Sequence, residues 1–451
     1  MKLLIAFLRV APGAALALAT TASFVAACGA DDANGATGGG GTPGGQTPSD
    51  AGNVTFPVTD GGILVNEADA GPPACRGDVP STAAPQASPP PAPALTLAAG
   101  YKIETLATVT SPRHLAALPN GDLLVGTSGN RLMLIPGAEA DGASGAATTF
   151  ATLPESQAHG VTFARANCTV YAATTQGIHS MPYVDGQTSA TPGSGIAKVR
   201  PGGGGGHVTT SLGFSQGQLY ASVGSSCNAC VETDPTRATI QIMGADGSGM
   251  TTRAKRIRNA IAVAVHPQTG SLWAGGAGQD DLPPGHPYEF LDPVTAHAGV
   301  ADYGWPDCEE NHVAYKAGAD CSGVVVPRVV VPAYSTIIGA AFYPANQPGT
   351  FAFPASHKGG LFLSLHGSWH DANGKYIAAP RVVFVEMDGD TPKIPVDWAD
   401  PQKQLTDFVA GFQLADGTTR IGRPSGVAVG ARGSLFVADD QANVVYRIRP
   451  K

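Results

Sequence analysis

The chain has 451 residues, with 59 Gly, 37 Pro and only 14% charged residues. This composition is typical of all-β proteins with many turns, and it argues against helical bundles and coiled coils. The net charge is −8 and no Lys/Arg cluster is present, which argues against a nucleic-acid-binding surface. No window after residue 30 is apolar for long enough to span a bilayer.

The start of the chain predicts an export signal that ends in a lipid-anchored cysteine. Two basic residues precede an apolar run over residues 14–25, and Val25-Ala-Ala-Cys28 matches the bacterial lipobox. We therefore expect residues 1–27 to be removed and acyl chains on Cys28 to hold the protein on a membrane. The alternative is an ordinary signal peptide with a chance cysteine. Gly29 follows, and by resemblance to lipoprotein sorting patterns this favours the outer membrane, so we expect a periplasmic, cell-envelope protein.

Residues 28–95 are predicted to be a disordered tether that precedes a folded domain of residues 96–451. The tether includes Gly38–Gly41 and Pro89–Pro91, with Ser, Thr and Asp between them. Such a composition cannot bury enough apolar area to offset its ordering entropy. The segment is therefore expected to act as a spacer between the membrane and the domain.

Six cysteines remain after Cys28, and an even number in an exported protein indicates disulfides. Proximity in the sequence suggests Cys227–Cys230 and Cys308–Cys321, which leaves Cys75–Cys168, although fifteen pairings are possible for six cysteines. The Cys227–Cys230 spacing is also found in redox dithiols and in half of a zinc site. A structural disulfide is favoured because a second such pair, a histidine pair at finger spacing and a βαβ context are absent.

One strand–turn–strand signature recurs along the chain and predicts the fold. It is seen at residues 114–125, 160–171, 210–220, 260–273 and 425–437, and units near residues 113, 159, 208, 260, 338 and 424 give a count of six. Each unit is a β-meander with an apolar face that it cannot bury alone. Stacking the units around an axis buries those faces. We therefore predict an all-β, six-bladed β-propeller of four-stranded antiparallel blades, because a β-sandwich would not explain the repetition.

Polar residues flank these repeats, where the strand ends of a propeller meet its axis. His207 ends a run of five glycines, Arg258-Asn259 precedes the fourth repeat, His366 follows an apolar strand of the fifth, and Arg423 opens the sixth. Polar residues at the same place in several blades predict a common centre. Taken singly, each has an ordinary alternative: a loop histidine, a salt bridge between blades, or a turn-forming asparagine.

A set of motifs in a fixed order covers residues 95–451. They are Ser222–Cys230, Asp246–Gly249, Arg258-Asn259, Asp302–Pro306, His366–Trp369 and Gly422–Pro424. In combination they resemble the quinoprotein glucose/sorbosone dehydrogenases, and the sorbosone branch is the nearest. The resemblance implies an oxidoreductase that passes hydride from a sugar or sugar aldehyde to bound pyrroloquinoline quinone.

The resemblance also implies roles for five residues. In the family a histidine at the position of His207 is the general base on the substrate hydroxyl or hydrate, and imidazole suits this because its pKa lies near neutrality. The quinone carries three carboxylates, for which the guanidinium groups of Arg258 and Arg423 are suited. Asn259 and His366 are expected to donate hydrogen bonds to its ring oxygens or carboxylates.

A calcium ion and an electron acceptor are implied in the same way. In the family Ca²⁺ polarises the quinone as a Lewis acid, and its protein ligands are largely backbone carbonyls, which match Gly278 and Gln279 here. The chain has no haem CxxCH motif. We therefore expect the electrons to pass to a separate acceptor, a cytochrome or a quinone.

Three departures from the family pattern support rival interpretations. Gly276-Ala277 replace a polar pair, Val208 follows His207 in place of tryptophan, and Ser225 stands where the glucose branch has a carboxylate. The first two departures leave open a non-catalytic, carbohydrate- or ligand-binding propeller on the cell surface, whereas Ser225 concerns the substrate, because the sorbosone branch also has serine there. A lactonase-like hydrolase would need Ca²⁺ held by side chains from several blades, and the sequence shows no such set.

Overall fold

The computed structural model describes residues 75–80, 84–86, 94–200 and 205–451. The predicted signal peptide, the anchor at Cys28 and most of the predicted tether lie outside these residues, so they stay predictions, as do the domain boundaries. The described residues form strands, turns and two short 3-10 helices, η3 (Arg165–Asn167) and η4 (Pro401–Gln404). Among them, no helix has the length and apolar character needed to cross a membrane.

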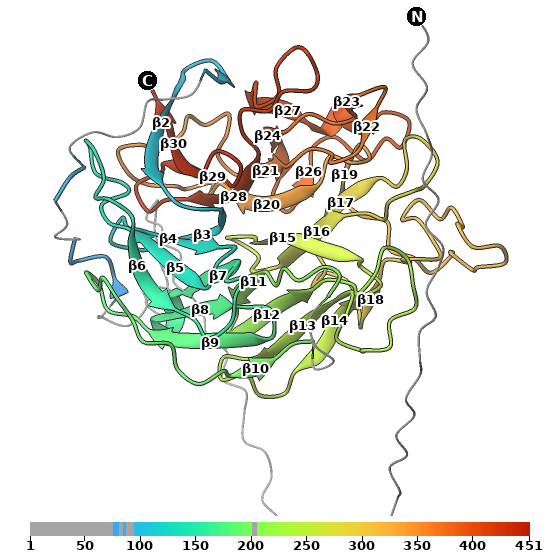
Figure 1. Cartoon of the computed structure of the whole chain (residues 1–451), viewed down its shortest axis with the longest axis horizontal. Helices are drawn as coiled ribbons and strands as arrows, with labels where there is room; N and C mark the ends of the chain where they lie inside the picture. The colour runs from blue at the N-terminus through green and yellow to red at the C-terminus, as the bar shows by residue number, and fades with distance from the viewer. Residues whose placement is uncertain (1–74, 81–83, 87–93, 201–204) are drawn as a thin grey trace, which may run out of the picture. The chain divides into compact units, whose positions relative to one another are not determined.

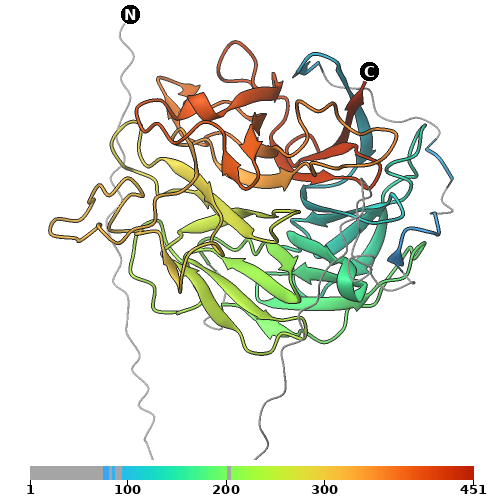
Figure 2. The same ribbon diagram turned by 180° about the vertical axis from the view of Figure 1, so that it is seen from behind.

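Six main antiparallel sheets follow one another along the chain and radiate from a common axis (Figures 1 and 2). Blade 1 consists of β3 (Pro112–Ala117), β4 (Leu123–Thr127), β5 (Arg131–Ile135) and β6 (Thr148–Thr152). Blade 2 consists of β7 (Gly160–Ala164), β8 (Thr169–Ala173), β9 (Gly177–Pro182) and β10 (Ala197–Lys198). Blade 3 consists of β11 (Leu212–Ser215), β12 (Gln218–Val223), β13 (Thr239–Gly244) and β14 (Thr251–Lys255), with β18 (Ala301–Asp302) added in parallel.

The remaining blades repeat the order from axis to rim. Blade 4 consists of β15 (Asn259–Val265), β16 (Leu272–Ala277), β17 (Glu289–Asp292) and β19 (Val329–Val331). Blade 5 consists of β20 (Ile337–Phe342), β21 (Leu361–Leu365), β24 (Arg381–Val385) and β27 (Thr406–Ala410), with β1 (Thr96–Leu97) outside them. Blade 6 consists of β28 (Pro424–Val429), β29 (Leu435–Asp439), β30 (Val444–Pro450) and β2 (Tyr101–Thr108). Two small hairpins are β22 (Asp371–Ala372) with β23 (Lys375–Tyr376), and β25 (Met387–Asp388) with β26 (Thr391–Pro392). The predicted six-bladed propeller is confirmed.

Each pair of neighbouring blades encloses its own apolar core. The six main clusters of buried side chains each combine residues from two adjacent blades. The second strands β4, β21 and β29 are buried along their whole length because a neighbouring blade covers each of their faces. This explains why most residues of those strands are apolar, since burial of apolar surface is the main driving force of the packing.

The two ends of the described domain close the ring. The early strand β2 pairs antiparallel with the last strand β30, with Tyr101 opposite Pro450. Blade 6 is therefore completed by residues from both ends of the domain, which ties the first and last parts of the ring together.

The first strands of the blades line an axial cavity of ≈ 250 Å³. Glycines allow these strands to approach each other closely: a Cβ atom on Gly160, Gly339 or Gly426 would collide with a backbone carbonyl of the neighbouring blade. The ends of the first strands are thereby held close together around the axis.

All three predicted disulfides are present. Cys75–Cys168 ties residues 75–80 to blade 2, where the amides of Gly77 and Asp78 also donate to the Asp185 carboxylate. Cys308–Cys321 closes the long insertion before β19.

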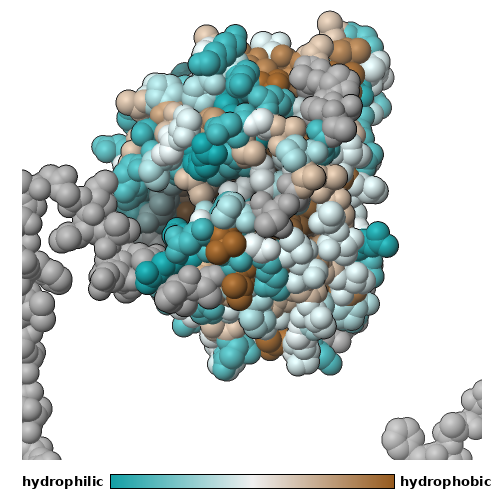
Figure 3. Space-filling view, turned by 90° about the vertical axis from the view of Figure 1, so that its left-hand side faces the viewer, coloured by the Kyte–Doolittle hydropathy of each residue, from teal (hydrophilic) through white to brown (hydrophobic). Residues whose placement is uncertain are grey.

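Seen from the side, the surface is a mosaic in which small apolar patches are separated by polar residues (Figure 3).

Candidate active site

The residues singled out in the sequence lie at one end of the propeller, which we call the mouth. In an antiparallel blade, the start of the first strand and the end of the second strand lie at the same edge, as the pairs Asn259–Ala277 and Pro424–Asp439 show. The mouth is formed by the loops at these strand ends. It carries all seven predicted residues, which are His207, Arg258, Asn259, Gly278, Gln279, His366 and Arg423.

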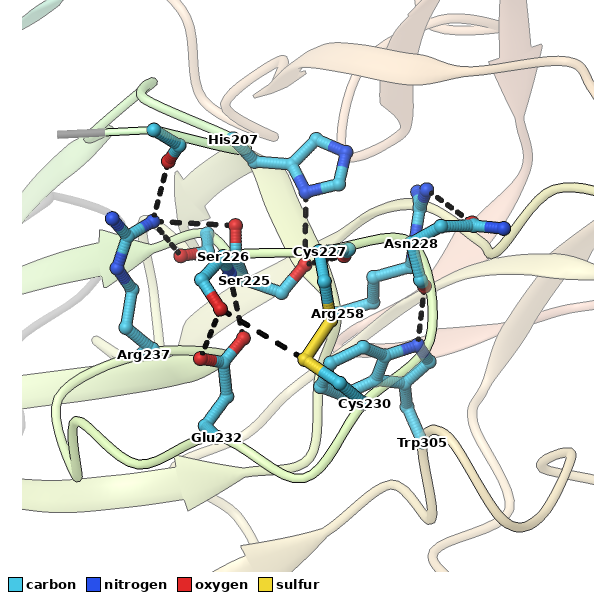
Figure 4. Close-up of a disulfide and its surroundings, with 12 residues drawn as sticks. His207, Ser225, Ser226, Cys227, Asn228, Cys230, Glu232, Arg237, Arg258 and Trp305 are labelled. Atoms are coloured by element: carbon cyan, nitrogen blue, oxygen red, sulfur yellow. Dashed lines mark hydrogen bonds between the residues drawn. A yellow bond between two sulfur atoms is a disulfide. The ribbon is translucent and has the colours of Figure 1, made fainter. Parts of the chain in front are cut away.

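Ser225 holds His207 through both the backbone and the imidazole ring. The His207 amide donates to the Ser225 carbonyl over 2.9 Å, and Nδ1 lies 2.8 Å from the Ser225 hydroxyl. That hydroxyl donates its only proton to the Cys227 carbonyl, 2.8 Å away (Figure 4). Because a carbonyl only accepts, the hydroxyl must accept from Nδ1–H, which leaves the lone pair of the neutral ring on Nε2.

The surroundings of His207 keep its ring neutral. Burial lowers the pKa of His207 to about 4, and the positive charge of Arg258 acts in the same direction. No residue in the described part of the chain hydrogen-bonds to Nε2, and Figure 4 shows this nitrogen pointing away from Ser225. His207 therefore presents an unprotonated nitrogen at neutral pH, but its pKa of about 4 lies below the near-neutral value expected from the sequence and makes it a weaker base than a free imidazole.

Gly224 brings His207 and Asn259 together. A Cβ atom on Gly224 would lie 2.6 Å from the His207 Cβ and 2.7 Å from Asn259 Oδ1. Such distances are too short for any side chain larger than hydrogen. The glycine at the end of β12 therefore allows the candidate base of blade 3 to pack beside the asparagine of blade 4.

Arg258 uses its guanidinium group for contacts within the protein. Its Nε donates to the Asn228 carbonyl over 2.9 Å and its Nη2 donates to Asn228 Oδ1 over 2.8 Å. Nη2 also lies 3.2 Å from Asp280 Oδ2, and Nη1 donates to the Gly278 carbonyl. The predicted bidentate contact with a cofactor carboxylate is therefore not open to Arg258 in this arrangement.

The contact between Arg258 and Gly278 also bears on the predicted calcium ligands. The Arg258 guanidinium already donates a hydrogen bond to the Gly278 carbonyl oxygen. Gln279 is buried, and its side-chain Oε1 has no hydrogen-bond partner among the described residues. Because a divalent cation bound at Gly278 would lie against a guanidinium of like charge, the residues as they stand do not fit a calcium ion there.

Blades 5, 6 and 1 supply a second cluster around Asp440. Its carboxylate accepts from His366 Nε2 over 3.0 Å and forms an ion pair with Arg113. Burial alone would raise the pKa of Asp440, but His366 and Arg113 lower it to about 2. The pKa of His366 is lowered to about 4, mainly by burial. Arg423 Nε and Nη2 donate to the carbonyls of His366 and Gly367 at 3.0 and 2.9 Å. His366 and Arg423 are thus brought into direct contact.

The mouth carries positive charge that suits an anionic cofactor. The guanidinium groups of Arg200 and Arg423 donate to backbone carbonyl and hydroxyl oxygens and to no carboxylate, although the charges of Asp234 and Asp440 act on Arg200 and Arg423 respectively. After burial, nearby arginines are a further cause of the lowered pKa of His159 and His207. A cofactor with three carboxylates fits such a field.

Sequence reasoning missed Arg113, Asp440 and Asn228. Arg113 is the second residue of β3, two places after the position that Arg258 and Arg423 hold before β15 and β28, so an alignment of the repeats does not point to it. Asp440 follows the last residue of β29, and nothing in the pattern distinguishes it from a surface aspartate. Asn228 lies between two cysteines, where its role depends on a fold that the spacing does not show.

The fold and the mouth define the chain as a six-bladed β-propeller whose polar centre is built from strand-end loops. The chain belongs to the TrAA12-like family, whose family model matches residues 95–312 and 308–451. It is similar to a calcium-containing structure of the Trichoderma reesei carbohydrate-active enzyme of family AA12, with a TM-score of 0.65, 20% identity and coverage of 80% of this chain and 98% of that one.

Other proteins share the fold at low sequence identity. The holo form of the pyranose dehydrogenase PQQ domain from Coprinopsis cinerea has a TM-score of 0.64 and 18% identity, covering 82% of this chain and 100% of that one. An oxidoreductase from Thermus thermophilus, described as a glucose dehydrogenase, has a TM-score of 0.51 and 17% identity, covering 77% and 100%. An uncharacterised protein of Borreliella burgdorferi is 22% identical over 196 residues, or 43% of this chain. The chain spans about half the length of that curated relative, since the match covers 47% of it.

Proposed function

We propose that the chain is an oxidoreductase that oxidises a sugar or sugar aldehyde with bound pyrroloquinoline quinone. The observation that carries the proposal is the fixed tautomer of His207, whose neutral Nε2 points away from Ser225 and has no hydrogen-bond partner among the described residues. Membership of the TrAA12-like family and the fold shared with a pyranose dehydrogenase PQQ domain support the same cofactor class here. The motifs shared with the sorbosone branch make sugar aldehydes the first substrates to test, beside aldoses.

His207 is the group that moves the proton in this proposal. Its Nε2 takes the proton from a substrate hydroxyl or aldehyde hydrate, while Ser225 keeps Nδ1 protonated and the ring in place. The bound quinone supplies the two-electron acceptor for the hydride of the same carbon. The two electrons then leave through a separate protein acceptor, a cytochrome, or a membrane quinone.

Asn259 and Arg423 are the residues best placed to hold the quinone. Asn259 packs beside His207 at Gly224, and the Arg423 guanidinium donates to two carbonyls and feels the negative charge of Asp440 without a bonded carboxylate. Arg258 and His366 are bound to other parts of the mouth, so we assign them to positioning the loops. No step is assigned to calcium, because Arg258 occupies the Gly278 carbonyl.

The test is a titration of the full chain with pyrroloquinoline quinone, followed by quinone absorbance and by dye reduction with a panel of aldoses and sugar aldehydes. We expect saturable binding and sugar-dependent dye reduction. In His207→Ala, we expect binding to remain and dye reduction to be lost, because only the base is removed. Absence of binding at micromolar quinone would overturn the proposal.

A non-catalytic, ligand-binding propeller is the second candidate. The internal contacts of Arg258 favour it, because they remove one cation that a quinone carboxylate would use. This function predicts heat of binding with a sugar in calorimetry, without quinone and without dye reduction. The same sugar panel therefore separates the two functions.

We also propose that the protein is exported and anchored at the cell envelope by acyl chains on Cys28. The lipobox at Val25-Ala-Ala-Cys28 supports this. Metabolic labelling with a fatty-acid probe should mark the wild-type protein and leave Cys28→Ala unlabelled. Labelling of both, or of neither, would contradict the anchor.

A further inference from the structure

A four-residue ring closed by the Cys227–Cys230 disulfide borders both His207 and Arg258 (Figure 4). Ser225, just before the ring, holds the His207 imidazole and donates to the Cys227 carbonyl. The Ser225 amide donates to the Arg258 carbonyl over 2.8 Å. The ring therefore contacts both sides of the candidate site through backbone and hydroxyl groups.

Asn228, inside this ring, uses all of its polar side-chain atoms and its carbonyl. Its carbonyl and Oδ1 accept from Arg258, and Oδ1 also accepts from the Asp280 amide over 2.8 Å. Its Nδ2 donates to the Asp280 carbonyl over 3.2 Å, and its carbonyl accepts from the Trp305 indole over 3.1 Å. Asn228 thus joins blade 3 to the loop after β16 and to the insertion that carries Trp305.

We propose that the Cys227–Cys230 disulfide is a redox-sensitive clamp that positions His207 and Arg258, so that its reduction lowers turnover while the propeller stays folded. Ser225 and Asn228 are the positioning residues through which the clamp acts. The inference rests on the proposed sugar oxidation at this mouth, but the clamp itself is measurable without that activity.

This disulfide differs from the other two in access and in the loop that it closes. The cysteines of Cys75–Cys168 and Cys308–Cys321 are buried, whereas Cys227 and Cys230 are half-buried. A cavity of ≈ 300 Å³ opens beside Cys230, lined in part by the exposed Val231. The bond spans only 3 residues of sequence, against 93 for Cys75–Cys168. Because the gain from cross-linking the unfolded chain grows with loop length, this ring adds least to global stability.

A small dithiol reduces this bond by two successive thiol–disulfide exchanges. One thiolate of the reductant attacks a sulfur of the Cys227–Cys230 bond and forms a mixed disulfide, and the second thiolate then displaces it. The ring gains two electrons and two protons and ends as two thiols, while the dithiol becomes a disulfide. Once the ring opens, the Cys227 carbonyl is no longer fixed against Ser225. The Ser225 proton is then free to turn towards His207 Nδ1, which moves the ring proton to Nε2 and removes the base.

The first test is limited reduction of the quinone-loaded full chain with dithiothreitol. The reductant is removed, free thiols are capped with iodoacetamide, and peptide mass spectrometry locates them. We expect capping at Cys227 and Cys230 only, an unchanged melting temperature, and a fall in kcat of about tenfold or more, since small displacements of catalytic groups carry losses of that order. Capping at this pair with unchanged kcat would overturn the clamp.

The second test compares two double variants, Cys227→Ser/Cys230→Ser and the matched control Cys75→Ser/Cys168→Ser. Burial and the charges of Arg258, Arg237 and Arg200 hold down the pKa of His207. Opening the ring relaxes the burial and the position of Arg258, so the acid limb of kcat/KM should move to higher pH in the first variant. The control should lower the melting temperature and leave both kcat and the acid limb unchanged. Equal losses of kcat in both variants, or an unmoved acid limb in the first, would contradict the clamp.

The contribution of Asn228 is tested by a conservative pair. Asn228→Asp keeps the one side-chain acceptor that Arg258 and the Asp280 amide share and loses the donor to the Asp280 carbonyl, whereas Asn228→Ala removes the acceptor and the donor. We expect Asn228→Asp to retain more of kcat than Asn228→Ala, and Asn228→Ala to lose only the part of its sensitivity to dithiothreitol that runs through Arg258, because the path through Ser225 remains. Full sensitivity in Asn228→Ala would show that Asn228 does not transmit the effect.

Hydrogen–deuterium exchange gives a readout that does not depend on catalysis. Reduction should speed exchange in residues 205–210 and 257–260, and leave the other blades unchanged. If the chain binds no quinone and oxidises no sugar, the proposed function fails, while the exchange pattern still decides whether the clamp exists. Unchanged exchange in both segments after confirmed reduction would reject it.

Discussion

Two histidines of the mouth, His159 in blade 2 and His207 in blade 3, lie at similar places. They differ in how many of their ring nitrogens are hydrogen-bonded. His159 directly precedes β7, with Nδ1 3.0 Å from Thr209 Oγ1 and Nε2 3.1 Å from Ser128 Oγ. His207 precedes β11, and Ser225 binds only its Nδ1. Burial is the main cause that lowers the pKa of both imidazoles.

The difference shows that burial and a lowered pKa do not by themselves identify a catalytic base. Both rings are neutral, but a ring with two bound nitrogens has no lone pair left for a substrate, whereas His207 keeps one on Nε2. The second hydrogen bond therefore separates a structural histidine from a candidate base.

Exchanging each histidine for glutamine is the sharpest test of the comparison. His207→Gln should lower kcat by about 10²- to 10⁴-fold, the usual contribution of a general base, with little change in melting temperature. His159→Gln should lower the melting temperature, because two buried hydrogen bonds are disturbed, and leave most of kcat. Steady-state kinetics and thermal unfolding of both variants check this. A larger loss of kcat in His159→Gln would reverse the assignment.

Filling the space beside His207 should produce the next largest effect. Gly224→Ala places a methyl group against the His207 Cβ and Asn259 Oδ1, so His207 must move. We expect kcat to fall by roughly 10- to 100-fold, as for other displaced catalytic groups. Gly142→Ala is the matched control, because nothing lies within 4 Å of its added Cβ. Similar kinetics for both variants would show that the position of His207 is unimportant.

The repeats made most of the fold predictable, because each strand pair buries the same apolar pattern and the units are counted directly. Two of the disulfides followed from short spacings and the third, Cys75–Cys168, from the even number of cysteines that remained. The entrance residues Arg258 and Arg423 were found because they flank repeats. Their side-chain partners were not, since a sequence does not show that Arg258 will meet the Gly278 carbonyl.

The candidate base illustrates the same limit. The glycine run and the family motif point to His207, but its tautomer depends on Ser225, 18 residues away, and on the Cys227 carbonyl. Closure by β2 and β30 was also missed, since the two strands lie at opposite ends of the domain. Contacts of this kind depend on three-dimensional register, which no local pattern contains.

Acid pH should destabilise the fold, and His159 should contribute to that loss. The pKa of His159 is lowered well below its ordinary value and that of His207 to about 4, so the unfolded chain binds protons that the folded chain does not. Stability from these groups is complete above about pH 6.5 and falls as the pH drops from there towards 4, by up to about 1.4 kcal/mol per pH unit for each histidine.

The measurement is urea unfolding of the wild type and His159→Gln at pH 7, 6 and 5. Burial raises the pKa of Glu289 to about 8, which acts with the opposite sign, so the prediction concerns the difference between the two proteins. The free energy of unfolding should fall less steeply on acidification in His159→Gln. Identical slopes would mean that His159 accepts a proton in the folded state.

The smallest expected effect is that of calcium on the protein without quinone. Arg258 occupies the Gly278 carbonyl, and a ligand raises stability only if the folded state has a site for it. Millimolar Ca²⁺ should therefore leave the wild-type melting temperature unchanged, while Arg258→Met, which frees the carbonyl, should allow an increase. A clear rise in the wild type would show that Arg258 withdraws when calcium binds. In that case a divalent charge would replace the guanidinium near His207, and the acid limb of kcat/KM would move to lower pH in calcium. The melting temperature in calcium and the pH dependence of kcat/KM together decide whether Ca²⁺ and the Arg258 guanidinium can lie at this side of the mouth at the same time.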